Sequence, residues 1–161
     1  MEVKVVTKRS FTVFGKEGHG EANHSDKWIP PLWKEAREHF SEIINLAKLD
    51  TTGNLAGFWG AMCDMNRQFA PWGEQGLYLA GCEVADGLPA PYGWTKWVIP
   101  SYRYAVTKCV KETYGEAFGY MRKVYMPKNN YSLVGAVHEF YSPKDKDGTL
   151  YLFFPIEKLE H

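Results

Sequence analysis

The chain contains one pattern of apolar residues twice, so its fold has to bury that pattern twice. Each copy has apolar residues at the three- and four-residue spacing of an amphipathic helix. The matching positions are Ala36, Phe40, Ile43 and Ala47 in the first copy and Tyr114, Phe118, Met121 and Tyr125 in the second. The same offset carries Leu55 and Gly57 onto Leu133 and Gly135. The alternative is a chance similarity between two amphipathic segments.

Each copy is expected to form a strand, a helix and two further strands. In the first copy, alternating residues at 3–13 predict a strand or bent strand pair, Pro30 and Pro31 open a helix over 32–47, and strands follow at 55–62 and 77–84. In the second copy the order is a strand at 97–110, a helix over 114–125, and strands at 133–141 and 150–156. Two such units can cover their apolar faces by pairing edge to edge about a pseudo-twofold axis, with a cleft at the join.

A chain of 161 residues is long enough for one sizeable core, so we expect a single domain over residues 1–158. The first unit would span about 1–85 and the second about 93–158, joined by a Pro- and Gly-rich crossover at 86–93. Residues 159–161 are predicted to be the remnant of an expression tag.

Composition argues against several classes of function. The 19 basic residues balance the 19 acidic ones, so the chain lacks the positive surplus of a direct nucleic-acid binder. Its three cysteines show no CxxC spacing, which argues against a disulfide framework and a metal site and favours the reducing cytoplasm. We expect no leader peptide and no membrane-spanning segment, and the sequence shows no motif for a cofactor or a familiar nucleophile. The oligomeric state is left open.

Glu139 is the candidate for chemistry. Two-residue alternation along 133–141 places it on one strand face with Leu133, Val137 and Tyr141. If that face points inward, the carboxylate must be paired, become protonated or meet a polar or cationic ligand. The alternative is an edge strand with Glu139 facing water. The repeat assigns Ala61 as its counterpart, so only the second unit would supply an acid.

Aromatic residues make up 16% of the chain, and their faces can hold a planar ligand or a cation. The alternative is an aromatic core, because most tryptophans in small domains are structural. The predicted ligand-binding residues are Glu139, Trp59, Trp94, Trp97, Tyr104, Tyr141, Phe58 and Met62.

Several motifs spread over most of the chain resemble the GyrI-like small-molecule-binding family, which supplies effector-binding domains to bacterial multidrug regulators. They are 76-GLYLAG-81, 92-YGW-94, 98-VIP-100 with Tyr104, 138-HEFY-141 and 154-FPI-156. The resemblance implies an α+β fold: duplicated β-α-β-β units that form a curved antiparallel sheet with two main helices. It also implies a ligand cleft between the halves and matches Glu139 to the acid that meets cationic drugs.

Three functions follow as hypotheses. The leading one is a stand-alone cytoplasmic protein that binds aromatic, in some cases cationic, xenobiotics or metabolites around Glu139. The second draws on a single-domain subfamily of similar Trp and Tyr content, and is an enzyme that hydrolytically opens the cyclopropane of DNA-alkylating natural products. Trp59, Trp94, Trp97 and Tyr104 would then form the cage and Glu139 would act on water. The third is a protein–protein inhibitor of gyrase type.

Overall fold

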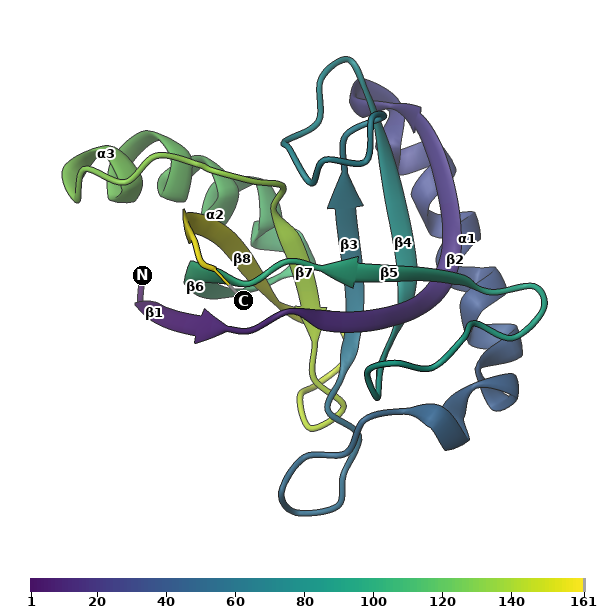
Figure 1. The fold of residues 1–161 in the computed structure, drawn as a ribbon. Helices are drawn as coiled ribbons and strands as arrows, with labels where there is room; N and C mark the ends of the chain where they lie inside the picture. Colours follow the sequence, from purple (N-terminus) through teal and green to yellow (C-terminus); the bar gives the residue numbers. More distant parts are fainter. Residues whose placement is uncertain (161) are drawn as a thin grey trace.

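The computed structural model describes residues 1–160, in which eight segments form one open antiparallel sheet (Figure 1). The strands are β1 (Val3–Lys8), β2 (Phe11–Glu21), β3 (Phe58–Cys63), β4 (Gln75–Val84), β5 (Thr95–Ile99), β6 (Tyr102–Val110), β7 (His138–Tyr141) and β8 (Thr149–Lys158). Their order across the sheet is β1-β6-β8-β7-β3-β4-β2-β5. The fold is therefore α+β, as the sequence predicts.

The sheet order shows the duplication directly. The central strands β7 and β3 are flanked by β8 and β6 on one side and by β4 and β2 on the other. The outermost strands are exchanged: β1 pairs with β6 of the second unit, and β5 pairs with β2 of the first. Each half of the sheet is thus completed by a strand from the other unit.

This exchange corrects the single strand predicted at 97–110. Pro100 and Ser101 separate β5 from β6, and the two strands pair with different neighbours. Proline cannot donate a ladder hydrogen bond, so it marks the break. The Ser101 hydroxyl oxygen accepts from the Ser10 backbone N–H at 2.7 Å, which ties this corner to the β1–β2 turn.

The helices pack on one face of the sheet, α1 (Ser25–His39) over β2 and β4, and α2 (Tyr114–Tyr120) on the second half (Figure 1). A π-helical turn, Met121–Tyr125, continues α2 into the short α3 (Met126–Lys128). No helix in the described part of the chain is long and apolar enough to cross a membrane.

The predicted start and end of the first helix are wrong. It begins at Ser25, before the two prolines, and its first turns lie directly on glycines of β2. Any Cβ atom at Gly20 would overlap Trp28, and one at Gly18 would overlap Leu32. The helix ends at His39, and 3₁₀ turns at Phe40–Glu42 and Ile44–Leu46 replace its predicted last turns.

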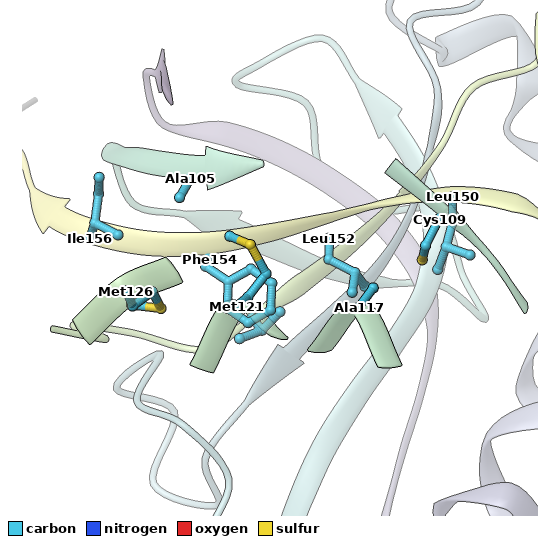
Figure 2. Close-up of a cluster of buried hydrophobic side chains, with 10 residues drawn as sticks. Ala105, Cys109, Ala117, Met121, Met126, Leu150, Leu152, Phe154 and Ile156 are labelled. Carbon is cyan, nitrogen blue, oxygen red and sulfur yellow. The ribbon is translucent and has the colours of Figure 1, made fainter. Parts of the chain in front are cut away.

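Both faces of the sheet are apolar. Beneath α2, Leu152 and Phe154 of β8 pack against Ala117 and Met121 (Figure 2). The face opposite the helices carries a second core, whose buried members are Phe11, Val13, Trp59, Ala61, Cys63, Leu77, Leu79, Trp97 and Ile99. A residue's position in the strand alternation therefore decides which of two separate environments it enters.

Candidate functional site

Glu139 lies at the middle of the sheet. It is on β7, and its direct partner on β3 is Gly60. The register pairs continue symmetrically from this central pair, through Leu152 on one side and Ala80 on the other. The pseudo-twofold axis therefore passes between Glu139 and Gly60.

This register corrects the predicted counterpart of Glu139. Ala61 belongs to the core on the face opposite the helices, whereas Glu139 is on the helix face. The residue that occupies the equivalent place is Gly60, one position earlier. A shift of one residue moves every side chain of a strand to the other face, so the small error in the repeat alignment changes the environment completely.

The Glu139 carboxylate accepts three hydrogen bonds from tyrosine hydroxyls. Tyr78 donates to Oε1 at 2.5 Å, Tyr114 donates to Oε2 at 2.6 Å, and Tyr141 donates to Oε1 at 3.2 Å. The Trp33 indole N–H in turn donates to the Tyr78 hydroxyl oxygen at 2.8 Å. We call these five residues the acid–tyrosine cluster.

The cluster draws on both units. Tyr78 comes from β4, Trp33 from α1, Tyr114 from α2 and Tyr141 from β7. Trp33 and Tyr114 each precede a fully buried alanine, Ala36 or Ala117, by one helical turn. The structure thus matches Ala36 with Ala117, whereas the predicted alignment matched Ala36 with Tyr114.

Gly60 provides the space for these contacts. A Cβ atom at this position would overlap the Tyr78 hydroxyl and lie 2.5 Å from Glu139 Oε1. Glycine is therefore needed here so that the side chains of Tyr78 and Glu139 can approach the β3 backbone, and not because of an unusual backbone conformation.

Burial raises the pKa of Glu139 above its usual range, and the hydroxyls of Tyr114, Tyr78 and Tyr141 act in the opposite direction. The same burial, followed by the charge of Glu139, raises the pKa of Tyr78 and of Tyr114. The hydroxyls therefore remain protonated donors, and donors that face a carboxylate favour its ionised form. Glu139 is only 7% exposed, so it does not lie on a solvated edge strand.

A groove of about 460 Å³ lies beside this cluster, between α1 and the turn that joins β7 to β8. Four aromatic residues line it, namely Trp33, Phe40, Phe58 and Tyr141. Charged residues at its walls are Arg37, Lys111, Asp145, Lys146 and Asp147. Because Trp33 and Tyr141 belong to both the groove and the cluster, a molecule in the groove would touch side chains that contact Glu139 directly or through Tyr78.

The predicted site residues separate into two sets. Phe58 and Tyr141 line the groove, and Met62 packs with Tyr78 on the same face. Trp94 stacks on Phe40 with ring centres 6.0 Å apart. Phe58, Tyr141 and Met62 therefore lie with the acid–tyrosine cluster, whereas Trp94 reaches the groove only through Phe40.

The remaining three aromatic candidates lie on the opposite face. The Trp59 indole donates to Glu83 at 2.9 Å, and the Trp97 indole donates to Glu17 at 2.7 Å. Tyr104 is fully buried, with its ring centre 6.4 Å from that of His138. The structure does not bring these residues to the groove.

Trp33, Tyr78 and Tyr114 are site residues that were not predicted from the sequence. Tyr78 lies in the motif 76-GLYLAG-81, and Tyr114 lies in the apolar stripe of the second helix. The two tyrosines could have been recognised because each places a hydroxyl at an otherwise apolar core position, and a buried hydroxyl requires a hydrogen-bond partner.

The family model for the GyrI-like small molecule binding domain matches residues 1–157. The chain belongs to this family. No curated protein matches it in sequence. Among solved structures, the family fold recurs in SAV2435 bound to tetraphenylphosphonium, at 18% identity and a TM-score of 0.68, over 98% of this chain and 94% of that one.

Two further structures share the fold. The C-terminal domain of EcmrR is 16% identical with a TM-score of 0.61, and the match covers 98% of each chain. A hydrolase from Listeria innocua is 10% identical with a TM-score of 0.55, over 97% of this chain and 92% of that one. At such identities the likeness establishes the GyrI-like fold alone.

Proposed function

We propose that this GyrI-like domain binds aromatic small molecules in the groove between α1 and the β7–β8 turn, with Glu139 as the polar centre of the site. The observation that carries the proposal is the acid–tyrosine cluster: a carboxylate at the centre of the sheet whose partners also form the aromatic wall of a groove. Trp33 and Tyr141 offer ring faces, and Phe40 and Phe58 extend the apolar surface.

A ligand that carries a positive charge fits this site, because Glu139 lies directly behind Tyr141 of the groove wall. A carboxylate in low-dielectric surroundings attracts a cation more strongly than one in water, and aromatic faces add cation–π attraction. SAV2435, which shares the fold, is described in complex with the aromatic cation tetraphenylphosphonium. The natural ligand would then be an aromatic, cationic xenobiotic or metabolite.

Titration with tetraphenylphosphonium, followed by tryptophan fluorescence and thermal shift, tests the proposal. We expect saturable binding that raises the melting temperature with ligand concentration. Glu139→Gln should weaken affinity by about tenfold or more, equivalent to about 1.4 kcal/mol. Glu116→Gln is the matched control, since Glu116 is exposed on α2. Absence of saturable binding to the unmodified protein, or equal affinity in both variants, would remove Glu139 from a binding site.

Hydrolysis of a cyclopropane-bearing alkylator is the second candidate, favoured by the shared fold of the Listeria innocua hydrolase and by the buried carboxylate. To activate a water, Glu139 has to be ionised and within hydrogen-bond reach of it. Both of its oxygens already accept from hydroxyls, and the Tyr141 contact, at 3.2 Å, is the longest. A water would therefore enter most easily in place of Tyr141.

Incubation with such an alkylator and product analysis distinguishes turnover from capture. Ring opening that exceeds the rate in buffer, and is lost in Glu139→Gln, supports the enzyme. A buffer-like rate despite saturable binding leaves a binding protein. No observation in the described residues favours the gyrase-inhibitor hypothesis.

A further inference from the structure

One cation of the protein already lies against the aromatic wall of the groove. Arg37 follows Trp33 by one turn of α1, and its guanidinium carbon is 5.6 Å from the centre of the Trp33 ring. Both residues line the groove with Tyr141. The positive charge of Arg37 also acts on Tyr141, where it opposes the rise in the pKa of that hydroxyl caused mainly by burial.

A second cation faces the groove from the other wall. Lys111 stands at the turn before α2, where its backbone N–H donates to the Gly148 carbonyl at 2.9 Å, and Gly148 also lines the groove. Among residues 1–160, neither Arg37 nor Lys111 has a carboxylate within ion-pair distance. Two cations without a bound counter-charge therefore flank the aromatic surface.

The other charges on the wall do not neutralise this pair. The Asp145 Oδ1 atom is 3.8 Å from the Nζ atom of Lys108, a residue that does not line the groove. Part of the Asp145 charge is therefore already compensated. Its Oδ2 atom is buried and has no hydrogen-bond partner among the described residues. Lys146 and Asp147 are exposed, adjacent and of opposite sign. The charges of Lys146 and Asp147 thus offset each other, and that of Asp145 is partly compensated by Lys108. Arg37 and Lys111 remain as the two cations without a paired carboxylate among the described residues.

Resting on the proposed function, we infer that Arg37 determines ligand specificity and that the preferred ligand is an aromatic molecule with an acidic group at the mouth of the groove. A guanidinium binds a carboxylate through two parallel hydrogen bonds, and Lys111 lies on the facing wall to share the charge. A ligand that carries only a positive charge has to compete with Arg37 for the face of Trp33 and meets like charge. The ligand class is therefore zwitterionic, with a donor or cation towards Glu139 and an acid towards Arg37.

Two dyes that differ only in one ester test this inference. Rhodamine 110 has a free carboxyl group, and rhodamine 123 is its methyl ester with a net positive charge. Fluorescence polarisation gives the affinity of each dye for the unmodified protein, for Arg37→Gln and for Lys34→Gln. Lys34 is exposed on α1 but does not line the groove, so its variant loses the same charge elsewhere.

We expect the unmodified protein and Lys34→Gln to bind the acid about fivefold more tightly than the ester, the scale of one exposed ion pair. In Arg37→Gln this preference should vanish, with weaker binding of the acid and tighter binding of the ester. Equal affinity for both dyes in the unmodified protein, or a preference that persists in Arg37→Gln, overturns the inference. Binding of tetraphenylphosphonium without either dye also overturns it and leaves the proposed function standing, whereas binding of none of the three overturns both.

Discussion

Acid should destabilise this protein through His138, which is fully buried on the face opposite Glu139. Its Nδ1 accepts the Met62 backbone N–H at 3.1 Å, so the neutral ring carries its proton on Nε2. That Nε2 has no hydrogen-bond partner among the described residues. Burial lowers the pKa of His138 from 6.5 to about 3, because an imidazolium in this position would be desolvated.

The sign follows from the difference in proton binding. The unfolded chain takes up a proton at His138 as the pH falls below 6.5, but the folded protein does so only near pH 3. The stability due to the neutral ring is fully present above the unfolded pKa and is lost as the pH falls through this window. Each pH unit within this window lowers the free energy of unfolding by about 1.4 kcal/mol. Acidification from pH 7 to pH 4.5 therefore lowers it by about 2.5 kcal/mol.

Urea unfolding at the two pH values measures this loss. His138→Asn keeps an acceptor for the Met62 N–H but does not titrate, so its free energy of unfolding should be lower at pH 7 and fall less towards pH 4.5. His19→Asn, at an exposed position, should follow the unmodified protein. Glu139, whose raised pKa works in the opposite sense, is present in all three proteins and cancels in the comparison. Parallel pH profiles for His138→Asn and the unmodified protein would refute the reasoning.

Two further predictions concern the fold. Gly60→Ala should lower the free energy of unfolding by about 1–3 kcal/mol in urea titrations, because its Cβ overlaps the Tyr78 hydroxyl. Gly119→Ala, which meets nothing within 4 Å, should be neutral or stabilising, and an equal loss in both would contradict the steric explanation. Removal of residues 1–8 should raise amide hydrogen exchange in β6, the partner of β1, above that in β2, whereas equal changes in both strands would argue against the exchanged pairing.

The sequence predicted the fold class because helical and alternating periodicities survive in each copy. Pro100 is a local sign that the strand predicted over 97–110 is divided, and the buried positions change phase there, from Trp97 and Ile99 to Tyr102 and Tyr104. What the sequence could not show is that β5 and β6 pair with different neighbouring strands. Partner choice is a long-range property that no local pattern encodes.

The site was predicted in part for the same reason. Alternation within one strand placed Glu139 and Tyr141 together, and the structure confirms that they share a face. Whether Trp59 shares that face depends on the register between β3 and β7, which the repeat alignment missed by one residue. Tyr114 enters the cluster from a helix, so its role depends on tertiary packing.

The position of Glu139 beside the pseudo-twofold axis explains why only one unit can carry this acid. In a symmetric dimer of a single unit, the residue at this place would face its own copy across the central strand pair. Two glutamates would then meet, and one of them would have to take up a proton or be expelled. Two glycines would leave no charge at all. In a single chain that contains both units the two positions can differ in sequence, so glutamate lies on one side of the axis and glycine on the other.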